Sequence, residues 1–267
     1  MKNALDASGT VVSSSSRFLK KHILVSIDDT DNLESRGTGE LASQIAEELE
    51  KNGWGISSYV TRHQLLVHPD IPYTSHNSAM CFSAEVDEAA VDTIVTHAAD
   101  FLARESAPGS DPGLCVAVVD RLLDPDCLLR FGLKAKKEVL TKEEAYEAAR
   151  RIGVHLSEHG GSGQGVIGAL AGAGLRLGGN DGRLKGSIDV PTTQGMVSIR
   201  ELLNHPHVNA IRAIDGSEVH MEDMVKIGEK AKTVQQDGKA VLLVSAVQGD
   251  TDGASWQTIP RQQLKRY

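Results

Sequence analysis

An apolar stretch that runs into three aspartates constrains this chain more than any other feature: residues 23–49 read ILVSIDDTDNLESRGTGELASQIAEEL. The run Ile23–Ile27 is typical of a buried β-strand, and Leu41, Ile45 and Leu49 recur at helical spacing. The aspartates therefore stand where a strand ends and a helix follows. Open α/β sheets place their ligands at such strand ends.

The three aspartates, Asp28, Asp29 and Asp31, crowd like charges into four positions. A hard cation such as Mg²⁺ relieves that repulsion, and it takes one or two carboxylates together with the phosphates of a substrate. If the strand continued in extended form, Asp29 and Asp31 would share one face and Asp28 would point away. The alternative is that Asp31 or Thr38 caps the following helix. One such residue would favour a cap, whereas three aspartates favour a metal site.

A second unusual stretch, residues 158–190, is rich in glycine and contains GGSGQGVIGALAGAG. Glycines let backbone N–H groups approach an anion closely, and a helix N-terminus behind them adds a favourable dipole. The segment has neither the GK[ST] of a Walker loop nor the GxGxxG of a dinucleotide loop. The glycines concerned are Gly160, Gly161, Gly163 and Gly165. A turn before a closely packed helix explains the same glycines equally well.

The pentapeptide GGNDG at 178–182 stands between two short apolar runs. Its Asp181-Gly182 pair is typical of a β-hairpin turn. Asn180 and Asp181 are also candidates to face a ligand.

Alternating patterns predict the architecture. The first hundred folded residues follow the order β-α-β-β-α-β, which is the ferredoxin-like split βαβ pattern. Thr141 and Glu144 form a capping box that predicts a helix through Arg151. Asp237-Gly238 before AVLLVSAV predicts a hairpin.

We therefore predict a mixed α/β (α+β) fold in which a ferredoxin-like N-terminal half is joined to a second α/β half and a small C-terminal β segment. The expected divisions are a flexible leader at 1–21, the half with the aspartates at 22–120, the half with the glycine-rich loop at 121–215, and the β-rich segment at 216–267.

Composition limits the partners. The net charge of −8, the pI near 5.7 and the aromatic content of 4% argue against a general nucleic-acid binder, which needs a basic face and stacking platforms. No apolar run is long enough to span a membrane. Three widely spaced cysteines form no CxxC pair and suit a reducing compartment, so we expect a cytoplasmic protein without a membrane partner. The sequence leaves open whether copies form a homo-oligomer.

Four sequence blocks follow one another along the chain: IDDTD with its Arg-Gly turn, RHQLLVHPDIPYTSHNSA, GGSGQGVIGALAGAG and GGNDGR. Together they resemble the archaeal agmatinylcytidine synthetase family, which modifies a minor isoleucine tRNA. That family contains a kinase-like domain with an IDDTD motif, an RG-x-x-TT turn, an R-x-x-x-x-N-P-x-I-P-Y-K loop and a G-x-G-x-G-I-I-G-A-L motif. The resemblance covers roughly residues 23–186 and implies that the second α/β half is kinase-like.

The resemblance also implies roles for individual residues. Asp28, Asp29 and Asp31 would hold Mg²⁺ and act in phosphoryl chemistry on ATP, with Asp28 or Thr38 at the phosphoryl-acceptor position. The glycine-rich loop and Arg36 would offset phosphate charge. The second loop would contribute to the nucleotide site through Arg62, Tyr73 and Asn77.

The chain departs from the family pattern at three places. The Arg-Gly turn is two residues shorter, and Gly39 replaces the second threonine. Thr74 stands where the family has a lysine after Tyr73. No CxxC…CxxC zinc ribbon follows, and the region after residue 216 is too short for it and an OB module together. Because those modules grip tRNA in the family, we expect no strong autonomous nucleic-acid binding.

The sequence thus predicts an ATP- and Mg²⁺-dependent phosphoryl-transfer enzyme, kinase-like or ligase-like, that acts on an unidentified small-molecule or RNA acceptor. Two alternatives stay open. One is a nucleotide-binding regulatory module without turnover. The other is an RNA-modification subunit that relies on a partner chain for RNA binding.

Overall fold

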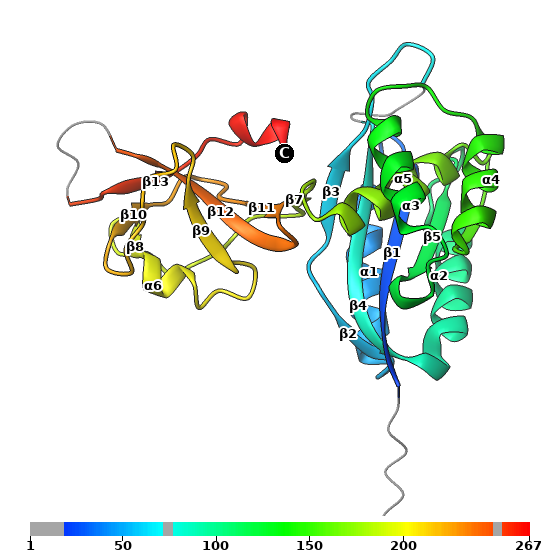
Figure 1. The fold of residues 1–267 in the computed structure, drawn as a ribbon, viewed down its shortest axis with the longest axis horizontal. Helices are drawn as coiled ribbons and strands as arrows, with labels where there is room; N and C mark the ends of the chain where they lie inside the picture. The colour runs from blue at the N-terminus through cyan, green and yellow to red at the C-terminus, as the bar shows by residue number, and fades with distance from the viewer. Residues whose placement is uncertain (1–18, 72–76, 248–252) are drawn as a thin grey trace, which may run out of the picture.

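The computed structural model describes residues 19–71, 77–247 and 253–267. Its helices and strands form two bodies that meet at one short strand, β7 (Arg183–Leu184) (Figure 1). Hydrogen-bonded pairing runs through β7 from one body to the other, in the order β6-β5-β1-β4-β3-β7-β11-β12-β13-β10-β8. The protein is therefore mixed α/β, with one continuous sheet.

The N-terminal body follows the predicted β-α-β-β-α-β order except that three strands, and not two, lie between its helices. Its elements are β1 (Lys20–Asp28), α1 (Thr38–Lys51), β2 (Gly55–Ser57), β3 (Thr61–Gln64), β4 (Ser78–Asp87), α2 (Val91–Glu105) and β5 (Gly113–Val118). Strand β1 lies in the centre and pairs antiparallel with both β4 and β5, so that Val25 lies opposite Phe82 on one side and Val116 on the other. A single strand over 56–68 would have been the simplest expectation, but β2 and β3 are separate and both pair with β4.

Helices cover both faces of this sheet. Helices α1 and α2 bury Leu41, Ile45 and Ile94 against the β1 side chains Ile23 and Val25. The opposite face is covered by helices of the next segment of chain: α3 (Pro125–Ala135), α4 (Lys142–Ile152) and α5 (Gly165–Gly178). The same segment adds β6 (His155–Glu158) to the edge of the sheet beside β5. The capping box predicted at Thr141 is present at the start of α4. The first half of the chain is thus completed by residues from the predicted second half.

Helix α5 lies directly on the sheet because one of its faces is made of glycine and alanine. A Cβ added at Gly172 would lie 2.5 Å from the Ser26 hydroxyl of β1. A Cβ added at Gly174 would lie 2.1 Å from the Leu128 carbonyl oxygen of α3. These contacts support the interpretation of the segment as a closely packed helix, which was one of the two alternatives that the sequence left open.

The C-terminal body is a small β structure with one short helix. Its elements are β8 (Met196–Ser198), α6 (Ile199–Leu202), β9 (Ala210–Ala213), β10 (Met224–Lys226), β11 (Thr233–Gln236), β12 (Lys239–Ala246) and β13 (Trp256–Thr258). The predicted hairpin at Asp237-Gly238 is confirmed, because Gln236 pairs with Lys239 and both turn residues have positive φ.

One sequence expectation differs from the structure. GGNDG is not a β-hairpin turn: Gly178 ends α5, Gly179 has a φ of 73° at the helix C-terminus, and Asp181-Gly182 leads into β7. Within the region 121–215, helices α3–α5 pack on the N-terminal sheet, whereas β8 and β9 pack with the residues after 216.

The contact between α3 and α5 can be tested with two alanines. Gly174→Ala should lower the free energy of unfolding by about 1–3 kcal/mol, because its methyl group would meet a backbone oxygen that cannot move independently. Gly178→Ala is the control: its methyl group meets only the end of the Leu129 side chain, and alanine gains up to about 1 kcal/mol of helix propensity. Urea unfolding measures both, and equal stability of Gly174→Ala and the wild type would contradict this packing.

Candidate functional site

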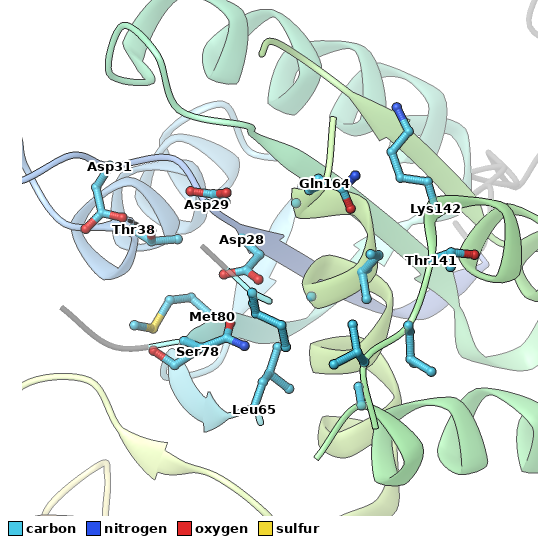
Figure 2. A pocket seen from close by; sticks show the side chains of 18 of the residues that line it. Asp28, Asp29, Asp31, Thr38, Leu65, Ser78, Met80, Thr141, Lys142 and Gln164 are labelled. Carbon is cyan, nitrogen blue, oxygen red and sulfur yellow. Dashed lines mark hydrogen bonds between the residues drawn. The ribbon is translucent and has the colours of Figure 1, made fainter. Parts of the chain in front are cut away.

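A pocket of about 660 Å³ opens at the carboxyl end of β1. Its walls come from the start of α1, from β3 and β4, from the connection between α3 and α4, and from the N-terminus of α5 (Figure 2). One side is acidic and the other is largely apolar, with Leu65, Met80, Val139, Leu140 and Ile167 among its lining residues.

All three aspartates of the opening motif line this pocket. Strand β1 ends at Asp28, and Asp29 adopts a φ of 52°, so the extended geometry stops there. The expectation that Asp28 would point away from Asp29 and Asp31 is therefore wrong. Figure 2 shows the three carboxylates along the same side of the pocket.

Burial and mutual repulsion make Asp28 and Asp29 difficult to ionise. Asp28 is 9% exposed, and a Cβ added at Gly168 would lie 1.6 Å from its Oδ2. Burial, and then the charge of Asp29, raise the pKa of Asp28 to about 8. Burial, and then the charges of Asp111 and Asp31, raise the pKa of Asp29 to about 6. Full ionisation of Asp28 and Asp29 thus requires a positive charge in the pocket.

Hydrogen bonding around the cluster excludes the capping alternative. Helix α1 begins at Thr38 after Gly37, which makes no side-chain capping bond. The Thr38 hydroxyl instead donates to Asp31 at 3.0 Å. Within the described ranges, no lysine, arginine or histidine forms an ion pair with any of the three aspartates.

The donor set fits a divalent cation that is shared with a ligand. Over the residues that the structure describes, no three His, Cys, Asp or Glu side chains are arranged to hold a metal ion by themselves. Mg²⁺ does not require such a set, because one or two carboxylates with substrate phosphates and water complete its shell. Asp29 and Asp31, on the open side of buried Asp28, are the residues that would supply the protein ligands.

The glycine-rich loop already holds an anion, and that anion is a side chain. Backbone N–H groups of Ser162 and Gly163 donate to Asp111 Oδ1, the latter at 3.3 Å, and the Ser162 hydroxyl donates to Asp111 Oδ2 at 2.7 Å. Gly161 and Gly163 have φ of 57° and 76°, and a Cβ at Gly161 would lie 1.8 Å from Asp111 Oδ1. The loop therefore has the geometry of an anion cradle. Of the four predicted glycines, only Gly165 lines the pocket.

The remaining predicted residues divide between the pocket and other places. Arg62 lines the pocket and donates from Nε to the Ser78 hydroxyl at 2.9 Å, and Asn77 lines it beside them. Arg36 does not reach the pocket, because its guanidinium pairs with Glu105 at 2.7 Å. Tyr73 lies outside the described residues.

Asn180 and Asp181 lie at the junction of the two bodies. Asn180 accepts from the Asp237 backbone N–H at 2.9 Å. Asp181 pairs with His63 Nδ1 at 3.0 Å and with Lys136, and His63 in turn contacts the Thr61 hydroxyl at 2.7 Å. Thr61 and His63 are fully buried, so this chain of polar groups fixes the junction and does not line the pocket.

Sequence reasoning missed the wall formed by residues 135–143. It carries Thr141 and Lys142 into the pocket, and Lys142 also binds Glu158 at 2.8 Å and the Ser162 carbonyl at 2.7 Å. The sequence did carry a signal for helix α3, which leads into this wall: Asp124 caps the helix and Pro125 occupies its first turn.

The raised pKa of Asp28 gives the metal-free protein a characteristic pH dependence. The folded pKa of about 8 exceeds the unfolded value of about 3.9, so the folded state binds an extra proton between these values and the free energy of unfolding falls as pH rises through them. Asp28→Asn should reduce that fall, which is on the order of a few kcal/mol, and leave the part due to Asp29. Urea unfolding at pH 5 and pH 8 with EDTA measures it.

The control is Glu85→Gln, which removes an exposed carboxylate from β4 and should keep the wild-type pH slope. Identical slopes for the wild type and Asp28→Asn would mean that Asp28 stays ionised in the folded protein.

Comparison with known proteins gives relatives over part of the chain. No protein-family model matches. An uncharacterized protein of Methanocaldococcus jannaschii is 32% identical over 157 residues, which are 57% of this chain and 49% of that protein. The isoleucine tRNA 2-agmatinylcytidine synthetase TiaS of Methanosarcina acetivorans is 33% identical over 162 residues, which are 58% of this chain and 36% of that enzyme.

The solved structures give the same relationship. A crystal structure of TiaS in complex with its isoleucine tRNA and ATP matches 58% of this chain and 36% of that chain, with 28% identity and a TM-score of 0.50. The chain thus spans about half the length of the first relative and about a third of the synthetases. In the described part of the chain, no helix is long and apolar enough to cross a membrane. Over 58% of its length, the chain is a partial homologue of the core region of TiaS.

Proposed function

We propose that this protein is an ATP- and Mg²⁺-dependent phosphoryl-transfer enzyme, related to the TiaS core and acting on an acceptor of its own. The observation that carries the proposal is the unneutralised cluster of Asp28, Asp29 and Asp31 in one 660 Å³ pocket. Ionised carboxylates repel phosphate groups unless a cation binds with both. A bound Mg²⁺ would offset the charge of the transferring phosphoryl group.

The residues of the chain would mainly hold and orient the nucleotide. Asp29 and Asp31 would hold the cation, and the Thr38 hydroxyl keeps the Asp31 carboxylate in place. The N-terminus of α5, which lines the pocket through Gln164 and Gly165, would favour the negative phosphates. The apolar wall that includes Leu65 and Met80 would receive the base and exclude water from it.

The buried Asp28 would handle a proton on the acceptor side. A carboxyl with a pKa of about 8 exchanges protons near neutral pH, which suits a group that accepts the proton of an attacking hydroxyl. The Asp28 carboxylate packs directly against the backbone of Gly168, in the space that a Cβ at residue 168 would fill. This close contact limits the motion of the carboxylate.

The finer architecture belongs to the same proposal. We take the β5-β1-β4-β3 part of the sheet as the ferredoxin-like unit and α3–α5 with the glycine-rich loop as the kinase-like part. The relatives named TiaS are isoleucine tRNA 2-agmatinylcytidine synthetases, and one was crystallised with ATP and that tRNA. Of the ligands of that enzyme, the proposal assigns the nucleotide to this pocket.

A binding module without turnover is the second candidate. It is favoured by one observation: the Ser162 and Gly163 N–H groups, which would bind a phosphate, are already occupied by Asp111. A protein that binds nucleotide through the acidic pocket alone would not need to release them.

Ligand-dependent stability tests the shared part of both candidates. Mg²⁺–ATP binds only the folded state, so at about 100 times its dissociation constant it should stabilise the protein by roughly 2.7 kcal/mol. Thermal unfolding with Mg²⁺–ATP, with ATP and EDTA, and with Mg²⁺ alone measures this. No shift with any Mg²⁺–nucleotide at millimolar concentration would contradict both candidates.

Two amide substitutions separate the enzyme from the module. Asp29→Asn and Asp31→Asn should abolish ATP hydrolysis or transfer, because an amide cannot replace a charged metal ligand. The metal-free variants should keep or gain stability, because each substitution removes like-charge repulsion at nearly constant volume. Phosphate release and metal-free melting curves measure the two effects, and Glu85→Gln serves as the control. Wild-type turnover in both variants would exclude these residues as metal ligands. Absence of turnover in the wild type would exclude the enzyme and favour the binding module.

A further inference from the structure

A second charged feature lies where the two bodies meet, and its charge is opposite to that of the pocket. Strand β3 pairs antiparallel with β7, and this register places Arg62 directly opposite Arg183. Side chains that face each other in this way lie on the same side of a sheet, and like charges in such a pair destabilise it. The fold therefore holds two guanidinium groups together across the junction.

Two more cations extend the pair. Lys232 Nζ donates to the Leu184 carbonyl at 3.3 Å, next to Arg183, just before β11 begins. Burial and the charges of Arg261, Arg183 and Arg62 lower the pKa of Lys232 to about 8. The charge of Arg261 also contributes to the lowered pKa of both Arg62 and Arg183, after burial. Arg62, Arg183, Lys232 and Arg261 thus form one group, called here the junction cations.

Two carboxylates act on this group without forming an ion pair with it. Across the described ranges, none of the four junction cations forms an ion pair with an acidic side chain. Asp31 acts electrostatically on Arg62, and Asp181 acts on Arg183, but Asp181 is already bound to His63 and Lys136.

Arg183 makes this arrangement costly. Arg183 is only 9% exposed, and its guanidinium forms no hydrogen bond with the described residues. Its nitrogens are not among the fully buried polar atoms, so they keep some contact with solvent. Largely buried charges in proteins are normally paired, since an unpaired one loses much of its hydration without compensation. In a protein with a net charge of −8, four unpaired cations in one place indicate a ligand that supplies the opposite charge.

We propose that the junction cations bind a phosphate monoester group of the acceptor, beside the nucleotide pocket and distinct from it. Arginine and lysine together suit a compact phosphate dianion, which accepts several charge-assisted hydrogen bonds. The assignment of this phosphate to the acceptor rests on the proposed function, whereas the anion site itself does not.

The geometry favours a separate phosphate over the nucleotide's own. Among the described residues, Arg62 is the only junction cation that lines the pocket, whereas Arg183, Lys232 and Arg261 do not line it. A small phosphorylated molecule also fits better than RNA. The cations are gathered at one point, whereas a nucleic acid needs a basic surface that follows its backbone.

Inorganic phosphate in EDTA is the probe for the anion site, and thermal unfolding is the readout. Phosphate should raise the melting temperature of the wild type more than that of Arg183→Gln, Lys232→Gln or Arg261→Gln. Lys226→Gln on β10 is the control, because it removes an exposed cation that belongs to no ion pair among the described residues and shares the general salt effect of phosphate.

Ligand-free stability distinguishes an anion site from a structural one. Arg183→Gln should melt at a higher temperature than the wild type without phosphate, because it removes repulsion and an unpaired charge. If Arg183→Gln does not fold, Arg261→Gln alone decides, since Arg261 is exposed and can be lost without a cavity. Equal phosphate shifts in the wild type, the folded junction variants and Lys226→Gln would overturn the anion site.

Competition tests the assignment to the acceptor. With the pocket saturated by Mg²⁺ and a non-hydrolysable ATP analogue, phosphate should stabilise the wild type further by the same increment. Mutually exclusive shifts would mean that the junction cations bind the nucleotide's phosphates, and would overturn the assignment. If the ATP analogue does not change the melting temperature but phosphate still raises it, the proposed function is contradicted and the anion site is still supported.

An RNA stem-loop provides the last arm. Sub-micromolar binding of that RNA to the wild type at physiological salt, lost in Arg183→Gln and Arg261→Gln but kept in Lys226→Gln, would overturn the monoester in favour of RNA. Weak, strongly salt-dependent binding that is equal in all four proteins is the expected result.

Discussion

The close approach of α5 to the central strand determines most of what this molecule can do. A helix with ordinary side chains on its inner face could not lie where α5 lies, because Cβ atoms at Gly168 and Gly172 would collide with Asp28 and Ser26. The same approach brings the N-terminus of α5 to the end of β1 and buries the Asp28 carboxylate. Fold and site thus depend on one contact, in which the small residues of α5 are needed for both.

Most strands and helices of the first 120 residues, and the start of α4, could be predicted because they have local signals. The apolar run of β1, the helical spacing of Leu41, Ile45 and Leu49, and the capping box at Thr141 are visible without tertiary structure. The outcome at Asp29 was not visible. Asp29 adopts a left-handed conformation at the end of the strand, which changes the direction of the following chain. Aspartate tolerates that conformation better than most residues, but its presence in a sequence does not predict it.

Tertiary packing also decided the interpretation of the glycines. Within the sequence, Gly178 to Gly182 resembles a turn between strands, and only the length of α5 shows that the first two glycines end a helix. Helix α3 was hidden for a related reason. Gly132 interrupts its pattern, and that glycine is there because a Cβ would lie 2.8 Å from the Ala171 carbonyl oxygen of α5. The residues that make close packing possible are thus the ones that weaken the helical signal in the sequence.

The charges on the two sides of β3 complete the argument. On one side, carboxylates crowd at the end of β1, and on the other, the junction cations crowd between β3 and β7. Arg62 belongs to both, since it lines the pocket, feels the charge of Asp31 and lies opposite Arg183. The carboxylates repel one another, and so do the cations, and in the described part of the chain no ion pair joins the two groups. Such an arrangement costs stability in the empty protein, and it becomes favourable when a cation and an anion fill the two places. Because Arg62 belongs to one body and Arg183, Lys232 and Arg261 to the other, an anion bound there would also connect the two bodies at the short strand β7 that joins them.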